Sequence, residues 1–104
     1  MMARGAKKRL NLEGLRLATY DVLMELDRDT EYIKEDIYQR VLDVYEKKAK
    51  HVIRLRGDPS SERVAMPVCR HFTNEGWITV KRNLVINGRE RPYVRHFKYK
   101  GDRQ

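Results

Sequence analysis

The chain has 104 residues, of which 40% are hydrophobic and 37% are charged, and this composition fits one small globular domain rather than a disordered segment. No apolar run approaches the roughly 20 residues that a membrane-spanning helix needs, and no apolar stretch follows the basic start of the chain as it would in a secretory signal. The single cysteine, Cys69, excludes an internal disulfide and is typical of a protein in the reducing cytoplasm.

The net charge of +8 is unevenly distributed along the sequence. Residues 1–10 carry four basic and no acidic side chains, residues 11–50 carry seven basic and ten acidic ones, and residues 51–104 carry twelve basic and five acidic ones. A basic second half that follows an acidic middle indicates a surface for a polyanion. The simpler alternative is a basic surface without any nucleic-acid role.

Residues 1–10 are expected to form a flexible basic arm. Lys7, Lys8 and Arg9 lie there with few apolar neighbours to anchor them. Two interpretations carry equal weight, namely a contact with phosphates or a minor groove on docking and a solvated tail.

Two amphipathic helices are predicted next. The first is capped by Asn11 and runs to about Leu26, and residues 27–30 then form a polar break before a very short strand or extended turn at 31–33. The second helix opens at residues 34–36, where acidic side chains lie near its positive end, and lysines load its last turn. The expected apolar faces are Leu15, Ala18, Thr19, Val22, Leu23 and Leu26 in the first helix and Ile37, Tyr38, Val41, Leu42 and Tyr45 in the second.

A third helix is predicted after a loop over residues 51–59, and Ser60 or Ser61 is expected to cap it. Its buried face is expected to consist of Val64, Val68 and Phe72, which recur every four residues. The pair Glu75-Gly76 then ends the helix. The proline at position 67 either kinks this helix or marks the first turn of a shorter helix that begins near residue 66.

Two strands are predicted over residues 77–86 and 91–100. The pair Asn87-Gly88 between them is favoured in type I′ turns because both residues tolerate positive φ. Pro92 fits an edge strand or the flank of the turn, where a missing N–H costs little. In the first strand the even-numbered positions hold Ile78, Val80, Leu84 and Ile86. In the second strand the odd-numbered positions hold Tyr93, Arg95, Phe97 and Tyr99.

Three short segments resemble a known superfamily. They are residues 14–17 (Gly-Leu-Arg-Leu), 35–41 (Glu-Asp-Ile-Tyr-Gln-Arg-Val) and 75–78 (Glu-Gly-Trp-Ile). With the order helix, short strand, helix, loop, helix and hairpin, they resemble the winged helix-turn-helix superfamily, and most closely the DNA-binding half of ferric-uptake-regulator-type repressors without their metal-binding dimerisation domain. The resemblance implies an α+β fold with three helices and a C-terminal β-hairpin wing over residues 11–100, flanked by the arm and by a tail at 101–104.

The candidate DNA-binding residues lie on the third helix, the hairpin, the loop and the arm. In winged helices the N-terminal turns of the third helix read the major groove, where Arg63 and Arg70 can reach guanine edges or phosphates. The alternative is an ordinary solvated helix face, and the aromatic residues of the hairpin are expected to pack on the helices rather than stack on bases. The full predicted set is Lys7, Lys8, Arg9, Arg54, Arg56, Ser60, Ser61, Arg63, Met66, Arg70, Lys81, Arg82, Arg89 and Arg91.

No metal site, cofactor or catalytic activity is expected. Cys69 and His71, with His51 and His96, lack the paired close spacing of zinc ligands, so a buried cysteine and surface histidines are the favoured interpretation. The sequence also contains no phosphate-binding loop and no nucleophile motif.

We therefore expect a cytoplasmic transcriptional regulator that binds double-stranded DNA sequence-specifically, with its third helix in the major groove and its basic wing on the backbone or minor groove. Two alternatives stay open. One is a winged-helix module that docks on a larger protein assembly, and the other is an RNA-binding protein, because A-form backbones attract the same basic surface. The sequence leaves open whether the protein acts as a homodimer.

Overall fold

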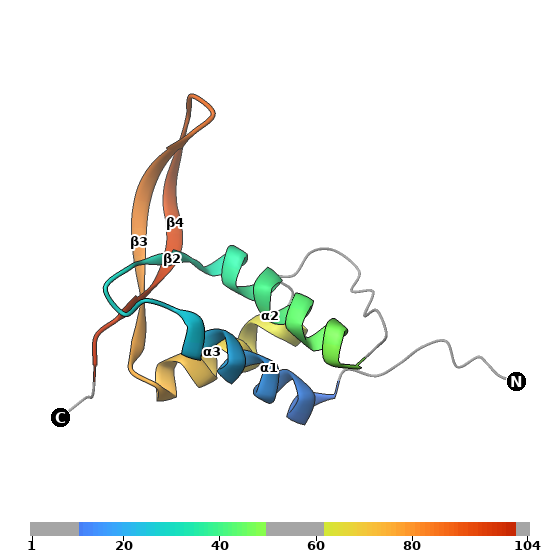
Figure 1. The fold of residues 1–104 in the computed structure, drawn as a ribbon. Helices are drawn as coiled ribbons and strands as arrows, with labels where there is room; N and C mark the ends of the chain where they lie inside the picture. The colour runs from blue at the N-terminus through green and yellow to red at the C-terminus, as the bar shows by residue number, and fades with distance from the viewer. Residues whose placement is uncertain (1–10, 50–61, 102–104) are drawn as a thin grey trace, which may run out of the picture.

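The computed structural model describes residues 11–49 and 62–101, and within them the chain has an α+β fold (Figure 1). The predicted arm, the loop at 51–59 and the tail from residue 102 lie outside the described residues, and no described helix is long and apolar enough to cross a membrane. This layout of three helices and a three-stranded antiparallel sheet is compatible with a winged helix. The elements are α1 (Leu12–Glu25), β2 (Tyr32–Ile33), α2 (Lys34–Ala49), α3 (Glu62–Asn74), β3 (Trp77–Ile86) and β4 (Arg89–Tyr99).

The cap of α1 is confirmed. Asn11 has extended backbone angles, and its side-chain oxygen accepts hydrogen bonds from the backbone N–H of Glu13 at 3.0 Å and of Gly14 at 3.2 Å. These bonds satisfy two of the free donors at the start of the helix. The backbone N–H of Asn11 donates in turn to the Tyr45 hydroxyl at 3.0 Å, so the same cap fastens α1 to the end of α2.

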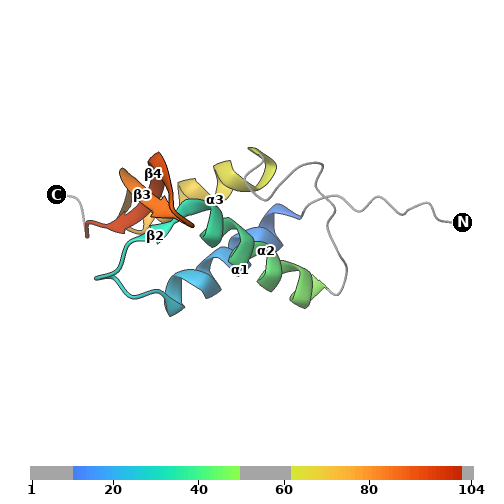
Figure 2. The same ribbon diagram turned by 90° about the horizontal axis from the view of Figure 1, so that it is seen from above.

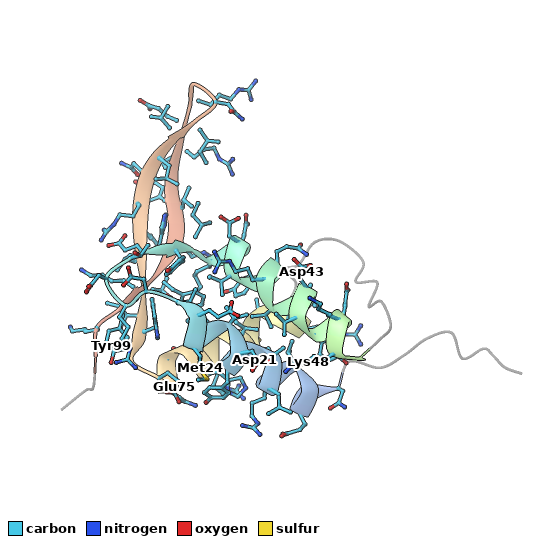
Figure 3. All side chains as sticks on the ribbon, viewed as in Figure 1. Asp21, Met24, Asp43, Lys48, Glu75 and Tyr99 are labelled. Carbon is cyan, nitrogen blue, oxygen red and sulfur yellow. The ribbon has the colours of Figure 1, made fainter. Side chains whose placement is uncertain are left out.

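The first two helices pack through the apolar faces that the sequence predicts. The α1 residues Leu15, Ala18 and Val22 are at most 1% exposed, and all five predicted α2 core residues are buried. On the surface, Lys48 pairs with Asp21 across the two helices (Figure 3). Both of these side chains are exposed, so the pair stabilises the contact by at most about 1 kcal/mol, and the apolar face provides most of the stability.

The third helix begins at Glu62, before the start near residue 66 that one of the two alternatives for Pro67 predicts. It runs without a break through Pro67, so a shorter helix that begins near residue 66 is wrong. The proline removes one backbone hydrogen bond, but Val64, Val68 and Phe72 are fully buried on both sides of it. Because this buried face spans the proline, tertiary packing offsets the loss.

Gly76 ends α3 and ties the foot of the sheet together. Its φ is +95°, and an added Cβ would lie 2.9 Å from the carbonyl oxygen of Gly101. The carbonyl of Gly76 accepts hydrogen bonds from the N–H groups of Lys100 at 2.8 Å and of Gly101 at 3.1 Å. Only glycine fits this position without strain, because it has both positive φ and a close backbone neighbour.

The sheet has the strand order β2-β4-β3, and β3 and β4 form a long antiparallel hairpin that rises well beyond the helices (Figure 1). Seen along the hairpin, the three helices lie mostly to one side of it (Figure 2). Only the base of the hairpin packs on the helices, through the buried side chains of Trp77 and Phe97. The Phe72 ring stacks on Phe97 at 4.2 Å and meets Trp77 edge-on at 5.7 Å, which joins α3 to the sheet.

The second strand differs from its prediction in two ways. It begins at Arg89 rather than at residue 91, because the connection consists of the two residues Asn87 and Gly88, which both have positive φ. It also contains a bulge, because the register shifts between Arg82 and Leu84 of β3. The regular alternation of side chains is therefore interrupted at Pro92 and Tyr93, which lie opposite the single residue Asn83.

Candidate nucleic-acid interface

The outer face of α3 carries the three helix residues that the sequence predicts for DNA contact. Arg63 and Arg70 are exposed, and Met66 is 55% exposed. They lie on the side of the helix opposite the fully buried Val64 and Val68. The predicted division of α3 into a core face and a solvent face is therefore confirmed.

The hairpin is strongly cationic. Its strands and turn contain six basic residues and one acidic residue, Glu90. The side chains of its upper part extend into solvent on both sides (Figure 3). The exposed cations are Lys81, Arg82, Arg89, Arg91, Arg95 and Lys98.

Arg82 is already bound to a carboxylate. Its Nε donates to Glu31 Oε1 at 2.9 Å, and its Nη2 donates to Glu31 Oε2 at 2.8 Å. The hydrogen bonds from Arg82 lower the pKa of Glu31, and the positive charge of Lys98 lowers it further. Arg82 thus fastens β3 to the segment before β2 and is less free than its neighbours to bind phosphate. The partner is 51 residues away in the chain, and no local signal indicates the pair.

A cavity of about 470 Å³ lies where the hairpin meets α2 and α3, and we call it the junction cavity. Arg91 and Arg95 of β4 and Ala65 of α3 line it together. Burial raises the pKa of Tyr38, another lining residue, to about 12, so its hydroxyl stays protonated and can donate a hydrogen bond. The lining residues are Ile33, Lys34, Glu35, Tyr38, Ala65, Arg91, Pro92, Tyr93, Val94 and Arg95.

Lys34 holds the three elements around this cavity in place. Although it is a lysine, it is only 8% exposed. Its ammonium group donates to the Thr79 hydroxyl at 3.0 Å, lies 3.5 Å from the Cys69 sulfur and lies 5.0 Å from the centre of the Phe97 ring. The first turn of α2 is thereby joined to α3 and to both strands of the hairpin.

A smaller hollow of about 270 Å³ lies between α1 and the other side of α3, and Arg16 and Arg70 line it with His71. Arg16 also binds Glu13, with its Nε 3.1 Å from a carboxylate oxygen. Burial lowers the pKa of His71, and the charges of Arg16 and Arg70 lower it further, so the imidazole is mostly neutral near pH 7. Arg16 therefore lies beside Arg70 with its charge already paired to Glu13.

Cys69 and His71 lie on different sides of α3. Cys69 contacts Lys34, whereas the His71 ring packs against the Tyr20 ring with 5.6 Å between their centres. In the described part of the chain, no three His, Cys, Asp or Glu side chains come together as metal ligands would. His51 lies outside that part.

Seven of the predicted site residues lie outside the described residues, and the remaining seven are exposed. Sequence reasoning left most of the cavity-lining residues out of the predicted set, among them the cations Arg16 and Arg95 and the aromatic residue Tyr93. The proline before Tyr93 was a signal of an irregular strand at that point. The seven outside are Lys7, Lys8, Arg9, Arg54, Arg56, Ser60 and Ser61.

No family model, curated protein or solved structure matches this chain.

Proposed function

We propose that the chain is a winged-helix protein that binds double-stranded DNA sequence-specifically and acts as a small transcriptional regulator. In this proposal α3 enters the major groove, and the hairpin is the wing that contacts the backbone or the minor groove. The observation that carries the proposal is the junction cavity, because α3 and the cationic hairpin border it together. Ala65 of α3 lies in its lining with Arg91 and Arg95 of β4, so the start of α3 and the middle of β4 can contact one ligand.

The dimensions of α3 suit this role. Its 13 residues make a helix of about 20 Å, and the major groove of B-DNA, about 12 Å wide, accepts one helix. The buried face of α3 fixes the helix on the domain. Its outer face can therefore bind DNA without any further ordering of the helix. Arg63 and Arg70 on that face are the side chains best suited to guanine edges.

The charge distribution supports the same orientation. The described residues 62–101 contain nine basic and three acidic side chains, whereas residues 11–49 contain six basic and ten acidic ones. A molecule with this polarity turns its α3 and hairpin side toward a polyanion during encounter. Most of the acidic side chains of α1 and α2 then lie away from the DNA, although the first turns of α2 border the junction cavity.

A competition experiment tests the class of partner. The full chain is bound to a labelled random duplex at low salt, and unlabelled duplex, structured RNA or single-stranded DNA is added. We expect the duplex to displace the label at the lowest concentration, because the exposed helix suits the wide major groove of B-DNA. Stronger competition by RNA would identify an RNA-binding protein, and no binding of the labelled duplex at low salt would refute duplex DNA as the partner.

A protein-docking module is the second candidate function. Large apolar side chains are exposed away from α3, with Met24 86% and Leu17 49% exposed on α1 and Val85 70% exposed on the hairpin. Exposed apolar residues of this kind are common at protein interfaces. This candidate predicts that nucleic acid is not bound at any salt concentration, and the same competition experiment therefore separates the two.

Specificity and affinity are expected to depend on different residues. Arg63→Ala or Arg70→Ala should weaken binding to a selected cognate site by about 1–3 kcal/mol while changing random-duplex binding less, because a bidentate base contact is lost. Arg89→Ala or Arg91→Ala should weaken cognate and random duplexes alike. Equilibrium titrations of both duplexes measure the difference.

A matched control for these variants is Lys47→Ala. Lys47 is exposed in the last turn of α2, and its loss removes the same charge outside the proposed interface. Its affinity should stay close to that of the unchanged protein. If the α3 variants kept full discrimination while the hairpin variants abolished it, the roles assigned to the two elements would be reversed.

A further inference from the structure

The bulge in β4 places one aromatic side chain at the mouth of the junction cavity. Arg82 lies opposite Val94 and Leu84 lies opposite Arg91, so both Pro92 and Tyr93 fall across from the single residue Asn83. Tyr93 is 72% exposed and lines the cavity. An exposed ring at a break in the strand contributes little to the core.

The backbone of Tyr93 is strained. Its φ is +62°, which bulky side chains rarely adopt, and the backbone N–H of Tyr93 donates to the side-chain oxygen of Asn83 at 3.2 Å. Glycine or asparagine would hold the same conformation at lower cost. Folding stability therefore gives no reason for a tyrosine here, and strain of this kind is often found at sites of function.

The side chains around the ring suit a nucleotide. Arg91 and Arg95 line the cavity beside Tyr93, and one carboxylate, Glu35, lines it as well. The ammonium group of Lys81 lies 6.0 Å from the centre of the Tyr93 ring. An arginine guanidinium group can donate two parallel hydrogen bonds to the oxygens of one phosphate, and a tyrosine ring offers a flat face for a sugar or a base.

We propose that the junction cavity is the binding site for one nucleotide unit of the nucleic-acid strand, with Arg91 and Arg95 on its phosphate and the Tyr93 ring against its sugar or base. This inference rests on the proposed function and adds to it a non-ionic contact made by the hairpin. The volume of about 470 Å³ is within the range of small-ligand sites. Tyr93 is then kept in a strained conformation because its ring contacts the ligand.

The test compares stability and binding in one variant. Tyr93→Gly should unfold at the same or a higher temperature than the unchanged protein, because glycine relieves the positive φ. Its affinity for duplex DNA should fall about 5- to 100-fold, as expected for loss of an aromatic contact to a nucleotide. The slope of log affinity against log salt should stay unchanged, because no charge is removed.

Three further variants complete the design. Tyr93→Asn tolerates positive φ and repeats the test if the glycine variant folds poorly. Tyr93→Phe should keep affinity within about twofold, because the ring is retained. Arg95→Ala should weaken binding and also reduce the salt slope by about one, which marks a phosphate contact.

The possible outcomes separate this inference from the proposed function. If the unchanged protein binds duplex and Tyr93→Gly binds equally well, the nucleotide site is refuted while DNA binding stands. If the unchanged protein binds no nucleic acid, both fail. The titrations are repeated with the single strand of the same sequence. A loss of affinity confined to the duplex indicates contact with a sugar of the duplex, and a loss seen with both the duplex and the single strand indicates base stacking.

Discussion

Phe72→Ala should lower the free energy of unfolding by about 3–5 kcal/mol, which is a large part of the stability of a small domain. Phe72 is fully buried, and its ring stacks on Phe97 and meets Trp77 edge-on. Truncation leaves a cavity where α3 meets the sheet, and the loss of two aromatic contacts adds to the cost. Chemical denaturation of the two proteins measures the difference.

Arg70→Ala is the matched control on the same helix. Arg70 is exposed, so its truncation should cost little folding stability and should instead weaken binding to DNA. Phe72→Leu keeps part of the packing and should lose less stability than the alanine variant. Equal losses in Phe72→Ala and Arg70→Ala would show that the faces of α3 are assigned wrongly.

Duplex binding should depend steeply on salt. If about 4–6 phosphates are contacted, log affinity should fall with log salt at a slope near −4 to −5. An approximately fourfold rise in salt would then weaken binding by about 250- to 1,000-fold. The exposed cations of the hairpin and of α3 are the source of this effect, because each phosphate contact releases condensed counterions. Fluorescence anisotropy at several salt concentrations measures the slope.

Single-residue changes assign the slope to particular contacts. Arg89→Ala should reduce its magnitude by about one, whereas Lys47→Ala in the acidic half of the molecule should leave it unchanged. A slope near zero in the unchanged protein would remove phosphate contact as the basis of binding. Equal reductions in both variants would indicate attraction to the overall charge rather than a defined interface.

Local patterns in the sequence were sufficient to predict the helices and the turn. The cap at Asn11, the buried face from Val64 to Phe72 and the turn at Asn87-Gly88 each depend on residues within a few positions of one another. Helix periodicity, capping and turn conformation are short-range effects, so a single sequence contains the necessary information. The cationic character of the hairpin was equally visible, because charge is a property of composition.

Tertiary structure alone decided the features that join distant segments. The pairing of Arg82 with Glu31, the burial of Lys34 and the placement of Arg16 beside Arg70 bring together residues with no local relation. Such contacts depend on how helices and sheet pack, and many packings are compatible with the same local patterns.

Pro67 and Tyr93 show, within single elements, the same difference between what local sequence predicts and what tertiary packing decides. Pro67 predicted either a kink or a helix start, and the helix start is wrong because α3 is continuous through the proline, with a buried face on both sides of it. Burial tendencies predicted that Tyr93 packs on the helices, but it lies in the bulge of β4, is 72% exposed and lines the junction cavity. The sequence by itself determined the elements and the charge of the candidate interface. The packing of those elements decided which cations stay free and where the cavity forms, because contact energies between distant residues outweigh local preference once the chain is folded.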